Sequence, residues 1–304
     1  MTLNAPVTLT SQRSALVKSL LRWYRTHARS MPWRRTHNPY RILVSEIMLQ
    51  QTQVHRVLLK YPEFIRRFPN FSILAESSPA EVIRAWAGMG YNSRALRLRE
   101  IARRVIADHR GKLPSSVEIL QTFPGIGRYT ANAVACFAFG QSTAVVDTNV
   151  RRVFARLFPR RNRFLDDWIT AGHLLPQNHA YEWNQALMEL GSTVCTSSSP
   201  DCSECPFHRR CPSAFHIRAG ARKAAAARKP AAIPDRIFRG RIISTLRSLN
   251  HNHSIELGRL ASLVRPESGR KKRDWFLQLL NGLERDGLIC VSVRNKKKYI
   301  SLPA

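Results

Sequence analysis

The chain has 304 residues and is 44% hydrophobic, which is enough for two or three domains with apolar cores. Its 49 Lys and Arg against 20 Asp and Glu give a formal net charge of +29, which predicts a polyanionic partner: nucleic acid first, an anionic membrane surface second. There is no run of 18 apolar residues and no signal-peptide pattern, so we expect neither export nor membrane insertion, and a cytoplasmic, nucleoid-associated location.

Residues 11 to 191 read as a succession of amphipathic helices with short connections. In "PAEVIRAWAGMG", for example, Val82, Ile83, Trp86 and Met89 recur at helical spacing, and glycines mark the end of the segment. No long alternating pattern typical of strands appears in this part of the chain. The fold class expected here is therefore all-α.

The stretch "SEIMLQQT" places a carboxylate, Glu46, in an otherwise apolar helical segment. The residues three and four positions away are Ile42, Leu43, Leu49 and Gln50, and three of these four are apolar. One interpretation is a solvated glutamate on a helix surface, because glutamate is almost never fully buried without a partner. The other is a desolvated carboxyl group, whose pKa its apolar neighbours would raise.

The stretch "TFPGIGRYTANAV" contains a tight turn between two helical segments, formed by Pro124, Gly125 and Gly127. Glycine allows positive φ and a close backbone approach, and the following helix offers free N–H groups to a phosphate oxygen. Many such turns merely join helices, so both interpretations stay open on turn chemistry alone.

The stretch "TAVVDTNVRRVFARLF" places Asp147 after a short apolar segment and directly before a predicted helix. An aspartate at this position is expected to cap the helix, because its carboxylate accepts hydrogen bonds from the first helical amides. Capping does not exclude a second, chemical role.

Four cysteines fall in the loop "CTSSSPDCSECPFHRRC", with six, two and five residues between them. In a cytosolic chain such clustering favours a metal site over disulfides. The spacing is too irregular for the paired ligands of a zinc ribbon, and His208 lies inside the last gap. An iron–sulfur cluster fits best, with zinc and disulfides as alternatives. The four cysteines are Cys195, Cys202, Cys205 and Cys211.

The C-terminal part begins with a predicted flexible basic linker at residues 217–234, which is rich in Ala, Arg, Lys and Pro. Residues 235–304 follow with three helical patterns and two alternating runs, "LICVSV" and "KYISLP", joined by "RNKKK". This order predicts a small winged-helix-like α+β domain. Its basic hairpin is either a DNA-contacting wing or a solvated turn.

Seven motifs resemble, in order and approximate spacing, the adenine-specific mismatch DNA glycosylases, the MutY group of the helix-hairpin-helix superfamily. The motifs are "MPWRRTHNPY", "SEIMLQQT", "AGMGYNSRA", "FPGIGRYTA", "VVDTNVRRV", "NQALMELG" and the four-cysteine loop. The resemblance covers residues of about 20 to 212. It implies a helix-hairpin-helix glycosylase domain at residues 11–216, with a 4Fe-4S cluster held by the loop 195–211.

The resemblance also implies a reaction and the residues that carry it out. Glu46 corresponds to the general acid that protonates the adenine, and Asp147 to the carboxylate that stays ionised beside the developing positive charge of the sugar, with Asn149 close by. We expect the helix N-terminus after Asp147 to keep it ionised. Tyr129 stands where the related endonuclease III group has a Schiff-base lysine, so the resemblance implies a monofunctional enzyme that leaves an abasic site.

Further residues are expected to touch DNA or the extruded base. Gln51 and Tyr91 correspond to wedges that enter the duplex, and ordinary packing is their alternative. The residues expected at the DNA backbone are Pro124, Gly125, Gly127 and Arg128, and those expected in the base pocket are Trp33, Arg34, Leu49 and Glu189. Trp33 and Leu49 also suit a plain core. The implied partner is double-stranded DNA with a mismatch or damaged base, bound by a monomer.

The chain departs from the family pattern at three places. Thr148 replaces a glycine after the catalytic aspartate, and Asn92 replaces the second tyrosine of a GYY motif. The C-terminal segment does not resemble the domain with which MutY enzymes read 8-oxoguanine. Two other functions therefore stay open: a thymine or uracil mismatch glycosylase of the same superfamily, and a non-catalytic DNA-binding regulatory module.

Overall fold

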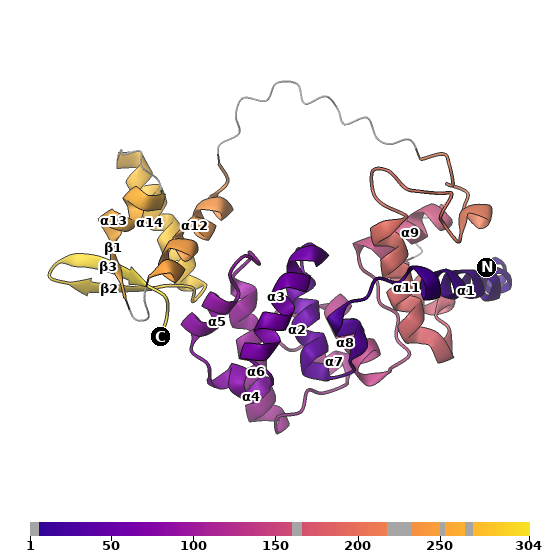
Figure 1. Ribbon diagram of the computed structural model, residues 1–304, viewed down its shortest axis with the longest axis horizontal. Coiled ribbons are helices and arrows are strands. Elements are labelled where there is room, and N and C mark those ends of the chain that lie inside the picture. Colours follow the sequence, from indigo (N-terminus) through magenta and orange to yellow (C-terminus); the bar gives the residue numbers. More distant parts are fainter. Residues whose placement is uncertain (1–5, 160–165, 218–232, 250–252, 265–269) are drawn as a thin grey trace, which may run out of the picture. The chain divides into compact units, whose positions relative to one another are not determined.

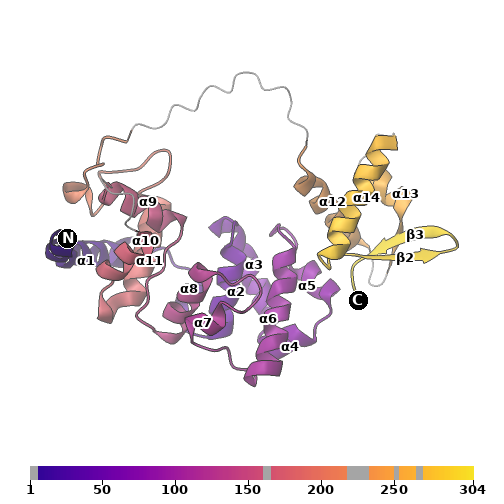
Figure 2. The same cartoon turned by 180° about the vertical axis from the view of Figure 1, so that it is seen from behind.

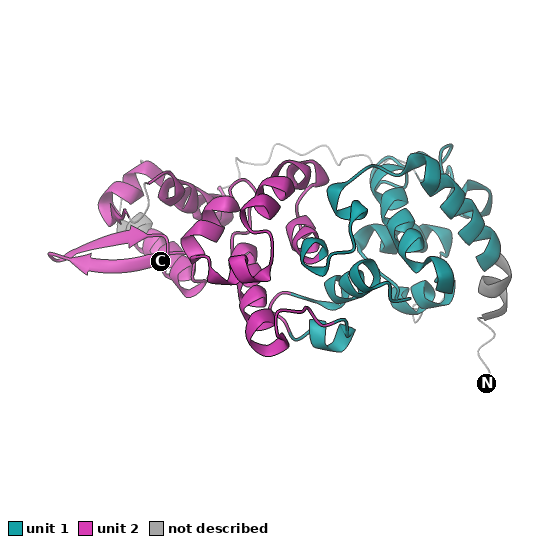
Figure 3. Ribbon diagram, turned by 60° about the horizontal axis from the view of Figure 1, so that its bottom comes forward, with its two compact units in different colours: residues 1–42, 115–122, 126–228 teal, residues 43–114, 123–125, 229–304 magenta. Residues whose placement is uncertain are grey.

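The computed structural model describes residues 6–159, 166–217, 233–249, 253–264 and 270–304. The described chain is mostly helical, as expected, with one small sheet near the C-terminus (Figures 1 and 2). It forms two compact units that do not follow sequence order (Figure 3). Unit 1 comprises residues 1–42, 115–122 and 126–228, and unit 2 comprises residues 43–114, 123–125 and 229–304. The predicted division into residues 11–216, 217–234 and 235–304 stays a prediction, and most of its linker lies outside the described residues.

Unit 1 contains the N-terminal helix, the second helix of the PGIG turn, and the helices before the cysteine loop. Its helices are α1 (Pro6–His27), α7 (Val117–Leu120), α8 (Arg128–Phe139), α9 (Thr148–Leu157), α10 (Asp167–Leu174) and α11 (Ala180–Thr193). Its short 3₁₀ helices are η1 (Pro32–Arg35), η2 (Gln177–His179) and η3 (His208–Arg210).

Helices α9 and α11 of unit 1 pack closely because of one glycine. A Cβ atom at Gly191 of α11 would lie only 2.6 Å from the Cβ atom of Asn149, in the first turn of α9. Real Cβ atoms do not approach that closely, so a larger residue at this position would push the two helices apart. Gly191 thus helps to place the start of α9, where Asp147 lies.

The PGIG turn joins α7 to α8, which lie side by side in both views (Figures 1 and 2). Gly125 has φ +79°, a conformation that glycine adopts at little cost, and Gly127 directly precedes the first residue of α8. Most of α8 is buried, from Thr130 to Phe137, and the helix ends at Gly140 in the left-handed conformation. The predicted helix–turn–helix is present in the structure.

Unit 2 contains most of α2 and four further helices, followed by the C-terminal elements. The helices are α2 (Pro39–Leu49), α3 (Val54–Arg67), α4 (Phe71–Glu76), α5 (Pro79–Ala85) and α6 (Ser93–His109). Side chains cap two of them as the sequence chemistry favours. Asn70 caps α4, and Ser78 forms a reciprocal capping box with Glu81 at the start of α5.

The C-terminal elements of unit 2 combine three helices with a three-stranded antiparallel sheet of order β1-β3-β2. The elements are α12 (Asp235–Ser248), β1 (Ile255–Glu256), α13 (Leu257–Val264), α14 (Arg270–Arg285), β2 (Cys290–Arg294) and β3 (Lys297–Ser301). Asn295 and Lys296 turn the β2–β3 hairpin with positive φ values of 48° and 60°. The three helices and the hairpin lie where the sequence patterns place them. Strand β1 was not predicted, because two residues carry no periodic signal.

None of the helices in the described ranges has the length and the apolar character needed to cross a membrane.

Candidate active site

Glu46 is a buried carboxyl group of unit 2. It lies on α2, only 4% of the residue is exposed, and the neighbouring Ile42, Leu43, Ile47 and Met48 are buried too. The interpretation of Glu46 as a solvated surface glutamate is therefore wrong. The helix thus places an ionisable oxygen pair where water has little access.

Gln51 and Tyr91, the two expected wedges, share an unusual backbone conformation in unit 2. Gln51 follows the end of α2 with φ 53°, and Tyr91 precedes α6 with φ 43°. Side chains other than glycine rarely adopt such angles, and those that do gather at functional sites. Both residues are exposed, Tyr91 at 56%, so neither serves as ordinary core packing. Leu49, by contrast, is half-buried on α2.

Arg94 joins the two turns that carry Gln51 and Tyr91. Its guanidinium is buried at the first turn of α6 and donates hydrogen bonds of 2.9 to 3.2 Å into both turns, together with a shorter one to Gln50. The acceptors are the carbonyl oxygens of Ile47, Met48, Gln50, Met89 and Gly90 and the hydroxyl of Thr52. Burial lowers the pKa of Arg94 to about 10, so the group is still a cation at neutral pH. The sequence analysis missed this role, because nothing local distinguishes Arg94 from other helical arginines.

The PGIG turn is tied to the end of α2 in the same unit. The side-chain amide of Gln50 donates to the carbonyl oxygen of Gly125 at 3.3 Å. A Cβ atom at Gly125 would lie 3.0 Å from Cδ of Arg97 and would also need the left-handed conformation. The left-handed conformation therefore favours glycine here, and a larger residue would also have to displace the Arg97 side chain slightly. Pro124, at the start of the turn, is half-buried.

Asp147 caps α9 in unit 1, as predicted. One carboxylate oxygen accepts the Val150 amide at 2.7 Å, and the other accepts the Asn149 side-chain amide at 2.8 Å. Burial raises the pKa of Asp147 above its usual value, whereas these hydrogen bonds and the charge of Arg152 oppose the increase without cancelling it. The N-terminus of the helix thus favours the ionised form but does not fully offset desolvation.

Arg152 connects the Asp147 cap to the cysteine loop within unit 1. Its guanidinium donates to Asn149 Oδ1 at 2.7 Å, to the Cys195 carbonyl at 2.8 Å and to the Gly191 carbonyl. The start of α9, the end of α11 and the first cysteine are therefore held by one cation. The sequence analysis assigned no role to Arg152.

Tyr129 and Arg128 open α8 on the C-terminal side of the PGIG turn. The Tyr129 hydroxyl is half-buried and donates to the sulfur of Met188 at 3.5 Å. Arg128 is exposed, with its guanidinium 4.1 Å from the ring centre of Trp168 and 3.9 Å from an Asp166 oxygen. It is thus a surface cation next to a turn whose amides suit a phosphate.

Glu189 is fully buried on α11 and is held by two arginines of unit 1. Arg29 Nε lies 2.5 Å from one carboxylate oxygen, and Arg34 Nη2 lies 2.7 Å from the other. Burial acts to raise the pKa of Glu189, but the hydrogen bonds and charges of these arginines outweigh it and lower the pKa. Arg34 also donates to Gln185 at 2.8 Å, and Trp33 beside it is buried. Arg29 and Gln185 are additions to the predicted pocket residues.

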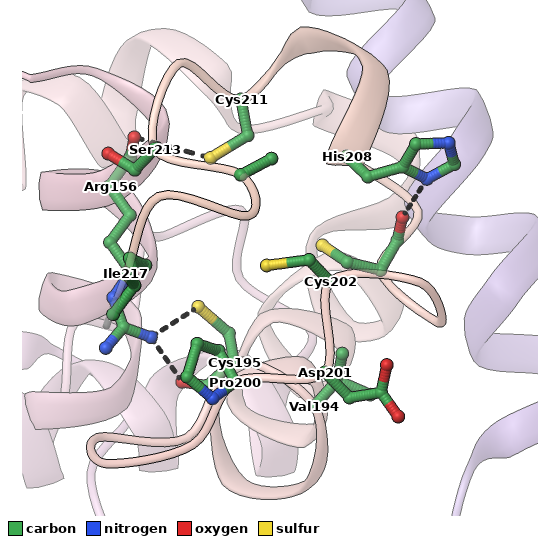
Figure 4. Close-up of a pocket in the computed structure, with 12 residues that line it drawn as sticks. Arg156, Val194, Cys195, Pro200, Asp201, Cys202, His208, Cys211, Ser213 and Ile217 are labelled. Atoms are coloured by element: carbon green, nitrogen blue, oxygen red, sulfur yellow. Dashed lines mark hydrogen bonds between the residues drawn. The ribbon is translucent and has the colours of Figure 1, made fainter. Parts of the chain in front are cut away.

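The four cysteines of the loop line one pocket in unit 1, together with Arg156 and His208. Figure 4 shows the sulfur atoms of Cys195, Cys202 and Cys211 pointing toward the centre of this pocket. Arg156 Nη1 lies 3.1 Å from the Cys195 sulfur and donates to the Thr196 carbonyl at 2.7 Å. The cation thereby holds the start of the loop on α9.

The four thiols line the same pocket, but their sulfur atoms are not arranged to coordinate a single metal ion. In the described ranges, no group of three or more His, Cys, Asp or Glu side chains has the geometry of an ion site. Burial raises the pKa of the Cys205 thiol to about 12, so this thiol is protonated unless an electrophile binds it. The pocket offers four thiol donors and one cation.

Comparisons with known proteins identify the family of this chain. The model of the HhH-GPD superfamily of base excision DNA repair proteins matches residues 44–166. The adenine DNA glycosylase of Mycobacterium tuberculosis (strain CDC 1551 / Oshkosh) is 47% identical over 206 residues, which are 66% of this chain and 68% of the relative. That of Mycolicibacterium smegmatis is 45% identical over 237 residues, 75% of this chain and 79% of the relative. The structure of a thermostable thymine-DNA glycosylase aligns with a TM-score of 0.64 and 31% identity, over 68% of this chain and 98% of that one.

The match to this superfamily and the identity to these relatives define a helix-hairpin-helix DNA glycosylase of base excision repair. Within this superfamily, the chain belongs to the adenine DNA glycosylases.

We predict that Arg94→Met lowers the free energy of unfolding by about 2–4 kcal/mol, because it leaves several buried carbonyl groups without a donor. Denaturant unfolding measures this loss. The matched control is Arg103→Met on the exposed face of α6, which we expect to change stability by less than about 0.5 kcal/mol. Equal losses in both variants would contradict the role of Arg94.

Proposed function

We propose that this chain hydrolyses the N-glycosidic bond of adenine mispaired with 8-oxoguanine or guanine in double-stranded DNA and leaves an abasic site. The observation that carries the proposal is the burial of the Glu46 carboxyl group in an apolar helix. Such a group is poised to hold a proton near neutral pH and to give it to a leaving base. The identity of 45–47% to adenine DNA glycosylases supports the choice of base.

The proposed reaction divides the work between two carboxyl groups in different environments. Glu46 gives its proton to the adenine, the bond between the base and C1′ breaks, and water supplies the hydroxyl that replaces the base, while the second proton of that water restores the Glu46 carboxyl group. Asp147 acts as a carboxylate that stabilises the positive charge developing on the sugar, with Asn149 holding its orientation. Because Asp147 must be ionised, its raised pKa places the acidic limit of the reaction above that of an ordinary aspartate.

The remaining predicted residues receive roles in DNA binding. Gln51 and Tyr91 fill the space left by the extruded nucleotide, since exposed side chains on left-handed turns suit insertion. Backbone phosphates are held by the turn residues Pro124, Gly125, Gly127 and Arg128, and the base pocket comprises Trp33, Arg34, Leu49 and Glu189. The two arginines on Glu189 keep it ionised as an acceptor for the exocyclic amine of adenine.

The cysteine pocket is proposed to hold a 4Fe-4S cluster on Cys195, Cys202, Cys205 and Cys211. Four thiols around one pocket match the ligand set of such a cluster, whose four iron atoms do not require the sulfurs to meet at one point. When bound, the cluster supplies structural cross-linking of the loop. This loop carries Arg209 and Arg210, which are exposed and suited to the DNA backbone.

A second candidate function is the removal of mismatched thymine, which the 31% identity to a thymine-DNA glycosylase favours. The higher identity to adenine DNA glycosylases favours adenine. A non-catalytic regulatory module would not need a buried carboxyl group at position 46.

We predict that Glu46→Gln lowers the single-turnover rate of adenine excision by about 10²-fold or more, because the amide cannot donate a proton at neutral pH. Rates are measured on duplexes containing A opposite 8-oxoguanine, A opposite G, T opposite G and U opposite G. Glu63→Gln, at an exposed glutamate of α3, is the control and should match the unmodified protein. If the unmodified protein excises thymine or uracil but not adenine, adenine is not the substrate. If Glu46→Gln excises adenine at the wild-type rate, Glu46 is not the general acid.

We predict that borohydride does not trap the unmodified protein on its DNA product, and that strands break only after alkali. A phenol at position 129 cannot form the imine that strand cleavage by this route needs. In Tyr129→Lys, an amine at this half-buried position would give some strand cleavage if enough of it is unprotonated. A borohydride adduct at any lysine of the unmodified protein would show that it is not monofunctional.

We predict that the purified protein contains about four iron atoms per chain and absorbs near ~400 nm, as thiolate-bound clusters do. Cys202→Ser should lose iron, thermal stability and DNA affinity together. Cys290→Ser, at an exposed cysteine of β2, is the matched control and should lose none of them. Colourless protein with stoichiometric zinc would overturn the cluster.

A further inference from the structure

The C-terminal elements share an apolar core with the wedge-bearing part of unit 2. Ile83 of α5 is fully buried within the core of this segment, beside residues such as Ile242 and Leu246 of α12. Leu96 of α6 packs on the same core, and its Cδ1 atom lies 3.7 Å from a Cβ position built at Gly287. Removing these apolar surfaces from water stabilises the attachment.

Polar contacts reinforce this attachment from both sides. Arg247, at the end of α12, donates to the Ile83 carbonyl at 2.9 Å and to the side-chain oxygen of Asn92 at 2.7 Å. In return, Arg84 of α5 donates to the Leu249 carbonyl at 3.0 Å. Burial, aided by the charge of Arg84, lowers the pKa of Arg247 to about 10. A guanidinium this desolvated needs its acceptors, so the contact is specific in geometry.

The contact with Asn92 reaches the residue next to Tyr91. The side-chain carbonyl oxygen of Asn92 is the acceptor that Arg247 uses. This contact therefore ties the end of α12 to the turn that carries Tyr91.

The β2–β3 hairpin of this segment is a strongly basic surface. Arg294, Lys296 and Lys298 are exposed, and residues 289–304 contain no acidic side chain. Lys297 pairs with Glu256 at 3.3 Å. Val293 is 66% exposed, and Figure 1 shows the end of the β2–β3 hairpin extending beyond the neighbouring helix α13. Exposed cations on a twisted hairpin suit a row of phosphates.

We infer that the β2–β3 hairpin is a second binding surface for the phosphodiester backbone of double-stranded DNA, fixed relative to Tyr91 by the contact between Arg247 and Asn92. The inference rests on the proposed function in one respect, the insertion of Tyr91 into the same duplex. It gives residues 235–304 a role in DNA binding: they lengthen the stretch of duplex that the protein contacts on the side of Tyr91. This contact is independent of the base sequence, because Lys and Arg side chains that bind phosphates do not distinguish one base from another.

The first test measures binding to undamaged duplex DNA as a function of salt. Replacing Arg294, Lys296 and Lys298 by Gln should weaken binding and reduce the slope of log affinity against log salt by about 2–3, close to 0.9 per phosphate contact. The control replaces three exposed cations of the same unit, Arg66, Arg103 and Lys112, by Gln. If the salt slope of the hairpin variant equals that of the control variant, the inference is overturned. The same variants are measured on single-stranded RNA, and a loss of affinity for RNA without a loss for duplex DNA would also overturn the inference.

The second test asks whether the hairpin acts from a fixed position. In an Arg247→Ala background, neutralising the hairpin should cost at least about threefold less affinity than in the unmodified protein, because the released segment no longer holds its cations at the duplex. Arg236→Ala, an exposed arginine of the same helix, is the matched control. If Arg247→Ala does not fold, Asn92→Ala removes the acceptor instead. Equal costs in both backgrounds would overturn the fixed position.

Binding to undamaged duplex requires no base removal, so these results separate the inference from the proposed function. Adenine excision with an unchanged salt slope would refute the hairpin contact alone. A reduced slope in a protein that removes no adenine would refute the proposed function alone.

Discussion

The buried guanidinium of Arg94 is the constraint on which the part of unit 2 around Gln51 and Tyr91 depends. It draws the end of α2 and the turn before α6 onto one cation. Both turns contain a residue in the left-handed conformation, Gln51 and Tyr91, which costs about 1–3 kcal/mol each unless surrounding contacts hold it. A delocalised cation with five N–H donors can satisfy many carbonyl groups at once, which a lysine could not do. The same helix that carries Glu46 is fixed at its end by this contact.

Three carboxyl groups with little exposure to solvent show how differently one chain can treat the same functional group. Glu189 is fully desolvated but paired with two arginines, so it is a stable anion. Asp147 is held by backbone and amide donors that only partly offset its burial. Glu46 lies on a helix whose nearby residues Ile42, Leu43 and Ile47 are buried and apolar. The differences come from the neighbours and not from the carboxyl groups, and they suit an acceptor, a charge stabiliser and a proton donor respectively.

Features with a local cause could be predicted from the sequence, and features that depend on distant residues could not. The capping role of Asp147 follows from an aspartate before an amphipathic helix, and the PGIG hairpin follows from its glycines. The burial of Glu46 was one of two interpretations, and the structure decided between them. Arg29, Arg94 and Arg152 were missed because each also donates to residues at least 43 positions away, and no local pattern around an arginine reveals such partners.

Gly191 matters through its small volume alone. Its missing side chain lets α11 lie against Asn149, which in turn donates to Asp147. One added methyl group would therefore shift the surroundings of Asp147 through helix spacing, with every ionisable group unchanged. When sequence variants of this enzyme are interpreted, some sensitive residues are therefore sensitive because of their volume alone. A search restricted to ionisable or polar side chains would not identify them.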